Sequence, residues 1–328
     1  MANVQTSSTE TTSNPLRRLS LRTLRTYFPI LLLVILCVVF GLLSERFLTP
    51  SNLAIVLQQT VVQLVVALGM TFVIIAGSID LSVGSIVALS AMAAASTSDQ
   101  LGIFAIFPAM LVGTVAGLVN GVIFAKGKVP SFMVTLGTLV AYRGLVVMVL
   151  RGAPISITNM DFLGPYGGRT AGLPNAAIFA AVIVVVTYII FNYTVFGRQV
   201  KAIGGGERVA ILTGIKVDRI KILMFTLLGL LCGLAGLLQS ARVFAATAQL
   251  GDGLELDVIA AVVVGGTPLT GGVGSIQGTI LGAFIMTILS NGMNMLGVDP
   301  YLQNIIRGVV LITAVFITID RSKIGIIK

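Results

Sequence analysis

Residues 61–90, VVQLVVALGMTFVIIAGSIDLSVGSIVALS, place a single carboxylate, Asp80, in a short polar break between two long apolar segments. These segments extend over 52–76 and 83–98, and neither alternates apolar and polar residues as a half-buried strand does. A helix needs roughly 20 apolar residues to cross the hydrocarbon core of a bilayer. Both segments are therefore predicted to be membrane helices.

The composition of the whole chain also indicates a membrane protein. Of its 328 residues, 56% are hydrophobic and only 10% are charged, whereas soluble globular proteins carry about 25% charged residues. The predicted fold class is all-α, a polytopic membrane helix bundle of about ten transmembrane helices with glycine-broken segments. The ten apolar segments are 28–44, 52–76, 83–98, 101–125, 131–150, 175–193, 222–242, 257–267, 275–297 and 302–319. Segment 257–267 is too short to cross alone, so it either continues from the preceding loop or is a broken helix.

The positions of Lys and Arg predict the orientation of the bundle. Ten crossings would place fifteen of the 21 on the side of the N-terminus and four in loops on the other side. The remaining two, Arg143 and Arg307, lie within spans. Cytoplasmic loops are rich in Lys and Arg. Both termini are therefore predicted to be cytoplasmic, and the net charge of +9 reflects topology rather than a nucleic-acid-binding surface.

A single transmembrane domain is predicted over residues 27–320. It follows a disordered polar and basic cytoplasmic segment over 1–26 and precedes a cytoplasmic tail over 321–328. The two longest connections are an outer loop over 151–174 and an inner loop over 197–221. Because so little of the chain lies outside the membrane, its function is expected inside the bilayer or through other subunits.

Several kinds of active site are excluded by residue types that the chain lacks. It has no histidine, which excludes a Ser-His-Asp triad, an HExxH zinc site and a His-based proton relay. Cys37 and Cys232 stand alone in apolar segments and are interpreted as small core residues. No catalytic residue and no metal site is predicted. The chain is therefore not expected to be an enzyme. A Walker nucleotide-binding sequence is also missing, so any ATP hydrolysis requires a separate polypeptide.

The break around Asp80 has two compatible interpretations. A carboxylate near the membrane centre costs about 2.5–3.5 kcal/mol on insertion scales, so it usually faces a cavity or a partner. Asp80 could therefore line a pathway. It could also cap the following helix by accepting a hydrogen bond from the backbone N–H of Ser82 or Val83. Small residues that permit a helix break surround it, namely Gly77, Ser78, Ser82, Gly84 and Ser85.

A second break resembles the first in sequence. VIIAGSIDLSVGSI, residues 73–86, is similar to VVGGTPLTGGVGSI, residues 263–276. Paired glycine-broken segments point to the substrate pathway of a transporter, and close helix packing would explain the same glycines. The candidate pathway residues of the second break are Gly266, Thr267, Gly271 and Gly272.

Arg143 and Arg307 are also candidate pathway residues, because a guanidinium within a span needs a partner. Acidic residues inside the spans are scarce, so backbone carbonyls or water in a cavity are the expected partners. In the inner loop, ERVAILT, residues 207–213, is predicted to form a short helix between Gly204–Gly206 and Gly214. Its apolar residues would contact either a cytoplasmic partner or the bundle itself.

Five ordered segments carry a resemblance to a known family. They are FLTPSNLAIVLQQT (47–60), GSIDLSVGS (77–85), NGVIFAKGKVPSFMVTLGT (120–138), FGRQVKAIGGGERVAILTGI (196–215) and GLELDVIAAVVVGGTPLTGGVGS (253–275). Together they resemble the permease subunits of bacterial ATP-binding-cassette (ABC) importers for monosaccharides, the ribose-type group that is related to branched-chain amino acid permeases. The resemblance extends from about Phe28 to Asp320.

This resemblance implies a multi-pass protein of the bacterial cytoplasmic (inner) membrane that passes ribose or a similar pentose or hexose into the cytoplasm. Its implied partners are a second permease copy in a homodimer, membrane lipid, a cytoplasmic ABC ATPase that holds ATP and Mg²⁺, and an extracytoplasmic sugar-binding protein. No cofactor is implied in this chain. The implied ATPase-coupling residues are Gly204, Gly205, Gly206, Glu207, Ala210, Leu212 and Gly214. The outer loop with Asp252, Glu255 and Asp257 would face the binding protein, and Asn120 joins the pathway candidates.

An ion-coupled secondary transporter of a small polar solute is the alternative. It would use Asp80 as a proton or sodium site and would need no ATPase. The isolated acid, the lack of histidine and the inner-loop helix disfavour it. A membrane enzyme is a third alternative, and no pair of carboxylates or nucleophile with its base supports it.

Overall fold

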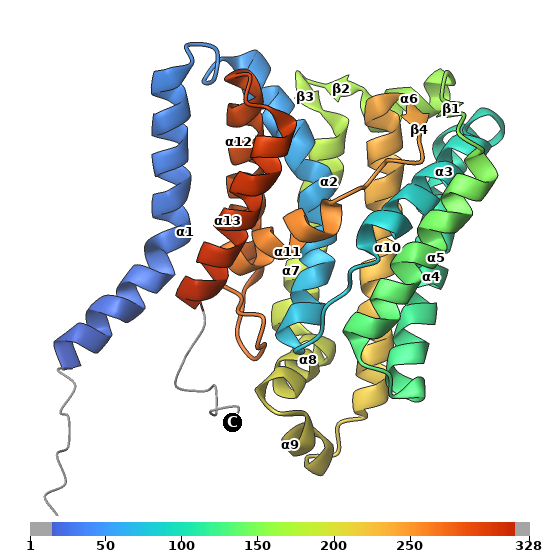
Figure 1. Ribbon diagram of the computed structural model, residues 1–328. Coiled ribbons are helices and arrows are strands. Elements are labelled where there is room, and N and C mark those ends of the chain that lie inside the picture. The colour runs from blue at the N-terminus through green and yellow to red at the C-terminus, as the bar shows by residue number, and fades with distance from the viewer. Residues whose placement is uncertain (1–14, 319–328) are drawn as a thin grey trace, which may run out of the picture.

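The structure is a computed structural model that describes residues 15–318 (Figure 1). The expectations for residues 1–14 and 319–328, including the C-terminal tail, lie outside the described residues. The elements in chain order are α1 (Pro15–Leu43), α2 (Pro50–Ile75), α3 (Val83–Leu101), the 3₁₀ helix η1 (Gly102–Ala105), α4 (Ile106–Gly127), α5 (Ser131–Leu150), β1 (Ile155–Ser156), α6 (Met160–Gly167), β2 (Arg169–Thr170), β3 (Leu173–Pro174), α7 (Asn175–Tyr193), α8 (Val195–Gly205), α9 (Glu207–Leu212), α10 (Val217–Val243), β4 (Ala245–Ala246), α11 (Leu254–Val264), α12 (Ile276–Met295) and α13 (Pro300–Thr318).

All ten predicted apolar segments are helical, which confirms a helical membrane bundle. Six helical stretches are long and apolar enough to cross a membrane, and one of them, Val83–Gly127, contains both α3 and α4. Tyr27–Leu43 and Pro300–Phe316 are apolar but shorter. The number of crossings therefore stays a prediction. Helix α1 begins at Pro15, so residues 15–26 are helical although they were placed in the polar N-terminal segment.

Helix α11 confirms that segment 257–267 is too short to cross alone. It has 11 residues, which at 1.5 Å per residue gives about 16 Å, roughly half of the hydrocarbon core. The helix ends at Val264, immediately before a glycine-rich connection that leads into α12. The glycine-rich connection is therefore a break inside the bundle, and it coincides with the second break predicted from the sequence.

The predicted inner and outer loops lie at opposite ends of the bundle (Figure 1). Helices α8 and α9 are at one end, and α6 with the four short strands is at the other. There β1 pairs antiparallel with β4, and β2 pairs antiparallel with β3. The end that faces the cytoplasm stays a prediction from the charge distribution.

Helices α2 and α10 form the centre of the bundle, and glycines allow α4 to approach α10 closely. A Cβ on Gly117 of α4 would lie 2.8 Å from the Cα of Gly229 on α10. Gly113 and Gly121, each one turn away on α4, also face α10. Small residues four apart permit such close backbone contact in membrane helices.

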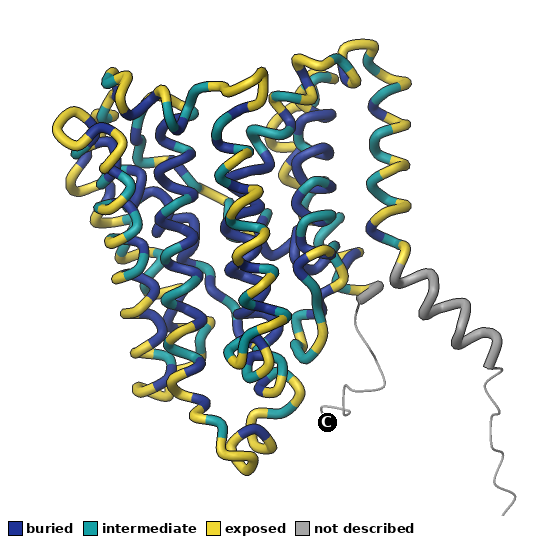
Figure 2. Tube along the Cα trace, turned by 180° about the vertical axis from the view of Figure 1, so that it is seen from behind, coloured by how far each residue is buried: buried dark blue, intermediate teal, exposed yellow. Residues whose placement is uncertain are grey.

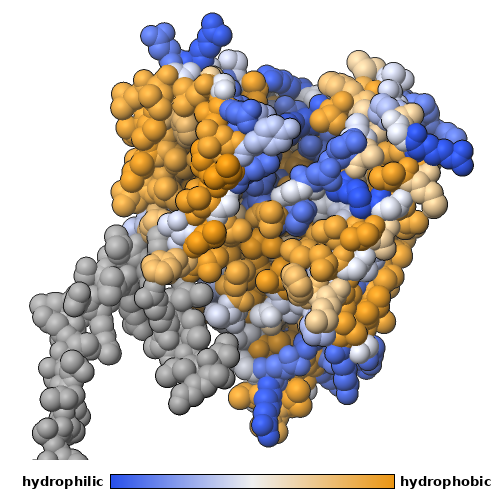
Figure 3. All heavy atoms as spheres, in the orientation of Figure 1, coloured by the Kyte–Doolittle hydropathy of each residue, from blue (hydrophilic) through white to orange (hydrophobic). Residues whose placement is uncertain are grey.

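Figure 2 shows exposed residues along the helices, and much of the face seen in Figure 3 is apolar. On α5, the side chains of Val140 and Met148 are 65% and 63% exposed, and Val182 on α7 is 58% exposed. Large apolar side chains on the outside of a helical bundle are suited to contact with lipid. In Figure 3, hydrophilic residues gather in the upper half of the face seen and at the lower end.

Candidate functional site

The break between α2 and α3 buries Asp80 completely. The backbone N–H of Ser82 donates to Asp80 Oδ1 at 2.8 Å, and the Ser82 hydroxyl donates to the same atom at 2.6 Å. Asn120 Nδ2, from α4, lies 3.4 Å from Asp80 Oδ2 and 2.8 Å from Ser82 Oγ. The predicted hydrogen bond from the N–H of Ser82 is present, but α3 begins at Val83 with Ser82 in its N-cap position, so Asp80 closes the turn before the helix and does not cap it. Within residues 15–318, Asp80 forms no salt bridge.

Helix α5 supports the backbone of this break. The backbone N–H of Ile79 donates to the hydroxyl of Ser131 at 3.3 Å, and the Ser85 hydroxyl donates to the carbonyl of Leu139 at 2.9 Å. Gly77 has a φ of +76°, which L residues with side chains rarely adopt. Ser78 is buried beside it. The small residues therefore permit the turn, the Ser131 hydroxyl satisfies the backbone N–H of Ile79, and the Ser85 hydroxyl ties α3 to α5.

The second break, between α11 and α12, turns at three glycines. Gly266, Gly271 and Gly272 have φ values of +96°, +76° and +83°. Thr267 is fully buried, and its hydroxyl has no hydrogen-bond partner within the described part of the chain. Ser275 ends the break by capping α12, because its hydroxyl accepts from the N–H of Gly278 at 3.0 Å.

The two breaks are in direct contact. The backbone N–H of Gly272 donates to the carbonyl oxygen of Ile75 at 2.9 Å. A Cβ on Gly271 would lie 2.9 Å from the backbone nitrogen of Gly77. Their similarity in sequence indicated corresponding roles, but it contained no information about this contact.

Gly204 of α8 packs on the junction of the two breaks. A Cβ on Gly204 would overlap the carbonyl oxygen of Ile75 and would lie 2.7 Å from the nitrogen of Gly272. The adjacent Gly205 has open space around the same position. The predicted coupling loop therefore contacts both breaks through one glycine.

Helix α9 confirms the predicted short helix, and Gly214 follows it with a φ of +85°. Ala210 is buried, whereas Val209, Ile211 and Leu212 are 64%, 55% and 81% exposed. Glu207 forms a salt bridge of 2.7 Å with Lys221 of α10. The helix is thus anchored on one side and presents an apolar surface on the other.

Lys201 holds α8 against α7. Its ammonium lies 3.9 Å from the centroid of the Phe191 ring, a cation–π contact. Burial lowers the pKa of Lys201. Thr194 caps α8, because its hydroxyl accepts from the N–H of Gly197 at 3.2 Å.

The arginines within the spans have acidic partners, which corrects the expectation of carbonyls or water alone. Arg143 Nη2 lies 2.7 Å from Asp252 Oδ1, and its Nη1 donates to the carbonyls of Ala248 and Leu250. Arg307 Nη1 lies 3.5 Å from Asp257 Oδ2. Both carboxylates were predicted to face a binding protein, and their pairing with the arginines was missed because only the fold brings them beside α5 and α13.

The same contacts occupy two of the three acids that were predicted to face a binding protein. Asp252 is still 59% exposed, whereas Asp257 is 25% exposed. Glu255 is half-buried beside Gly84, where a Cβ would lie 2.7 Å from Glu255 Oε2. Their predicted role toward a partner stays a prediction.

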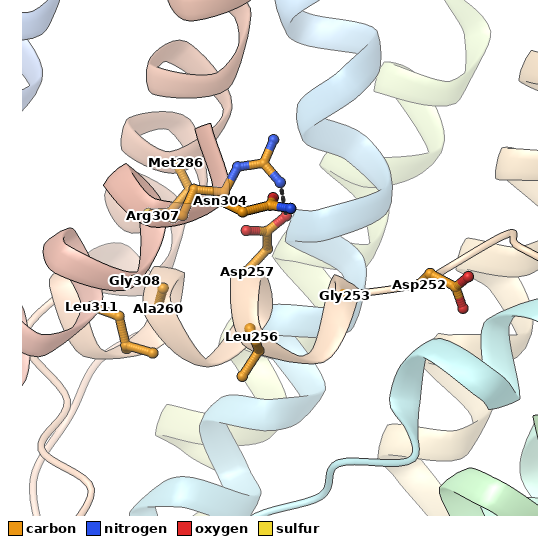
Figure 4. Close-up of a pocket in the computed structure, with 10 residues that line it drawn as sticks. All are labelled: Asp252, Gly253, Leu256, Asp257, Ala260, Met286, Asn304, Arg307, Gly308 and Leu311. Atoms are coloured by element: carbon orange, nitrogen blue, oxygen red, sulfur yellow. Dashed lines mark ion pairs between the residues drawn. The ribbon is translucent and has the colours of Figure 1, made fainter. Parts of the chain in front are cut away.

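A cavity of about 410 Å³ lies beside the Arg307–Asp257 pair, between α11, α12 and α13 (Figure 4). Its polar lining residues are Asp252, Asp257, Asn304 and Arg307. Within the described residues, no group of three or more Cys, Asp and Glu side chains could hold a metal ion.

Two residues of the site were missed at the sequence level. The Tyr142 hydroxyl donates to Asn120 Oδ1 at 3.3 Å, and Gln63 Nε2 donates to the carbonyl of Asp257 at 2.9 Å. Both are polar residues inside apolar segments, which is a signal that could have identified them.

A family model described as "Branched-chain amino acid transport system / permease component" matches residues 52–315. The chain belongs to this family. The matched part of the permease contains both breaks, α8, α9 and the two arginine–carboxylate pairs. With six helical stretches suited to crossing a bilayer, this permease is a multi-pass membrane protein.

The permease is similar to several curated transport proteins. The ribose import permease protein RbsC of Escherichia coli (strain K12) is 41% identical over 297 residues, which cover 89% of this chain and 92% of that protein. RbsC of Bacillus subtilis (strain 168) is 41% identical over 299 residues, with coverages of 90% and 92%. The xylose transport system permease protein XylH of Escherichia coli (strain K12) is 34% identical, with coverages of 82% and 85%. No solved structure matches the chain.

Proposed function

We propose that this permease is the membrane subunit of an ABC importer in the bacterial inner membrane, and that it passes a monosaccharide into the cytoplasm. The observation that carries this proposal is the 41% identity, over about nine tenths of the chain, to permeases named for ribose import. Relatives named for L-arabinose and xylose are 36% and 34% identical. Pentoses are therefore the first substrates to test.

A separate cytoplasmic ATPase supplies the energy in this proposal and holds ATP and Mg²⁺. The chain has no Walker sequence. Helix α9 offers the surface on which the ATPase would dock, because Val209, Ile211 and Leu212 are exposed next to an anchored backbone. An apolar patch at a helix in water is typical of a protein–protein contact.

The contact of Gly204 with both breaks supports a way to couple ATP hydrolysis to transport. A movement of α8, driven by an ATPase on α9, would displace the carbonyl of Ile75 and the N–H of Gly272 together. Asp80 and its partners Ser82 and Asn120 hold the first break in shape. We infer that the junction of the two breaks is a gate of the pathway, closed in this structure.

The remaining partners follow the same proposal. An extracytoplasmic sugar-binding protein would dock at the end that carries α6 and the short strands, and Asp252 is the most exposed of the three acids predicted to face it. A second copy of the permease would complete the pathway as a homodimer. The distribution of Lys and Arg supports cytoplasmic termini.

Uptake of radiolabelled ribose, xylose and L-arabinose into proteoliposomes tests the proposal, with the ATPase and binding protein present or omitted. The expected result is uptake that needs ATP and both partners. A Leu212→Glu variant should lose uptake and co-purification of the ATPase, because it places a charge on the exposed surface of α9. Leu173→Glu, at an exposed position at the other end of the bundle, is the matched control for ATPase binding.

The same assay separates the proposal from an ion-coupled transporter. Uptake by the permease alone, driven by a proton or sodium gradient and abolished by Asp80→Asn, would contradict the ABC mechanism. An Asp80→Asn variant that still needs ATP would support it.

A further inference from the structure

We propose that the cavity between α11, α12 and α13 is a binding site within the permease for the transported monosaccharide, formed by Asp257, Asn304 and Arg307. This inference rests on the proposed function and adds a defined sugar site to it. In Figure 4 the side chains of these three residues converge at one side of the cavity.

The polar groups of the cavity have unused hydrogen-bonding capacity. Arg307 Nε is buried and has no hydrogen-bond partner within residues 15–318. The Arg307–Asp257 pair is separated by 3.5 Å, whereas charge-assisted hydrogen bonds are about 2.7–2.9 Å long. A buried donor without a partner is unfavourable. A ligand with adjacent hydroxyls would supply acceptors for the guanidinium and donors for the carboxylate.

The charges around the cavity favour an uncharged ligand. Asp257 is balanced by Arg307, and Asp252 is balanced by Arg143 at 2.7 Å. Glu255 also lies in the first turn of α11, but it is not among the residues that line the cavity. The lining itself therefore has little net attraction for either an anion or a cation. A sugar carries hydroxyl groups that both donate and accept, which matches a balanced set of one guanidinium, one amide and carboxylates.

The remaining wall fits the carbon skeleton of a sugar. It is formed by the apolar residues Leu256, Ala260, Met286 and Leu311. The volume of about 410 Å³ lies within the range of about 300–1,000 Å³ typical of small-molecule sites. The cavity thus combines convergent polar groups on one side with an apolar surface on the other.

The position of the cavity connects it to the proposed gate. Leu256, Asp257 and Ala260 lie in the first two turns of α11, and the same helix ends directly before the second break. A sugar in the cavity would therefore contact the helix that leads to Gly272 and its bond to Ile75. We infer that the site holds the sugar on one side of the closed junction before it passes.

Cysteine protection in the permease–ATPase complex, reconstituted without the binding protein that would cover the end carrying the short strands, tests the site. In a background with Cys37→Ala and Cys232→Ala, Leu256→Cys places a thiol at a cavity residue that is 55% exposed. Leu173→Cys, 54% exposed in β3, is the control outside the cavity. Each is labelled with a maleimide in the presence of ribose, xylose, L-arabinose or leucine. At about three times the Kd of the sugar, mass action slows labelling of an occupied site about fourfold.

Protection by a transported sugar at Leu256→Cys, without protection at Leu173→Cys, is the expected result. Arg307→Lys, added to Leu256→Cys, should raise the sugar concentration needed for protection by about tenfold, the effect of losing a hydrogen bond to a charged group. Asn304→Ala removes a neutral hydrogen bond and should raise that concentration by about fivefold. Asn304 is exposed, so its replacement tests the site without altering the buried packing of the bundle.

Uptake measured after the binding protein is added to the same samples distinguishes the possible failures. The site is wrong, and the proposed function stands, if a sugar is taken up but does not protect Leu256→Cys. The same holds if the added Asn304→Ala and Arg307→Lys changes leave protection of Leu256→Cys unchanged. Equal protection by leucine would overturn the assignment to a sugar. If no sugar is taken up under any condition, the proposed function fails, and the sugar site fails with it.

Discussion

The backbone N–H of Gly272 donates a hydrogen bond of 2.9 Å to the carbonyl oxygen of Ile75, and this bond joins the two polar breaks of the permease. Ile75 is the last residue of α2. Carbonyls in the last turn of a helix have no partner within the helix. The N–H of Gly272 therefore supplies the Ile75 carbonyl with a hydrogen bond that lipid could not provide. Gly204 packs on the same carbonyl, which makes this contact sensitive to any movement of α8.

Replacing Gly204 with alanine should disrupt this junction. The added Cβ would overlap the Ile75 carbonyl, and such overpacking costs about 1–3 kcal/mol. We expect a lower thermal unfolding temperature in detergent and a loss of ATP-driven uptake. Gly205→Ala is the matched control, because its Cβ would meet no atom within 4 Å. Equal behaviour of the two variants would contradict the role given to Gly204.

Replacing Asp80 should separate its hydrogen bonds from its charge. Asn can still accept from the N–H of Ser82, so Asp80→Asn should keep most of the stability. Asp80→Ala leaves buried donors on Ser82 and Asn120 unpaired, at a cost of about 1–3 kcal/mol for each unsatisfied group. Thermal unfolding of both variants measures the difference. Equal losses of stability in the two variants would show that the negative charge matters more than the hydrogen bonds.

The two members of the Arg143–Asp252 pair should differ in their effect on stability. Arg143 also donates to the carbonyls of Ala248 and Leu250, and Arg143→Ala would leave these acceptors without their donor. Asp252 is 59% exposed, and exposed ion pairs contribute only about 0–1 kcal/mol. Asp252→Asn should therefore change the unfolding temperature little, and Arg143→Ala should lower it clearly. Equal losses would show that the ion pair itself holds the loop.

Close packing of α4 on α10 should depend on Gly117. A Cβ there would lie 2.8 Å from the Cα of Gly229 and would overlap the carbonyl of Phe225. Gly117→Ala should therefore separate the helices and destabilise the permease. On α5, Gly144 has no atom within 4 Å of the same position. Gly144→Ala should be neutral or stabilising by up to about 1 kcal/mol, the difference in helix propensity, as measured by thermal unfolding.

Much of the fold was predictable because hydrophobic length is a local property of the chain. Each of the ten apolar segments became a helix, and the short segment 257–267 became a helix of 11 residues. The hydrogen bond from the N–H of Ser82 to Asp80 and the short helix α9 were also predictable. In each case the residue that predicts the feature lies within a few positions of the backbone whose conformation it determines.

The partners of the arginines were not predictable in this way. Arg143 meets Asp252, and Arg307 meets Asp257, across helices that are far apart in the chain. A single sequence contains no distance between such residues. The cavity beside Arg307 was missed for the same reason, since Asn304 and Asp257 are ordinary polar residues until α13 packs on α11.

By itself, the sequence determined that this protein is a helical membrane protein with two similar glycine-rich breaks, because helix length, hydropathy and backbone freedom are properties of short segments. Only the tertiary structure decided that the two breaks touch at Ile75 and Gly272 and that Gly204 packs on both. That contact depends on the absence of a side chain at Gly204 and on an unsatisfied carbonyl at the end of α2. These two conditions meet only when the three segments fold together.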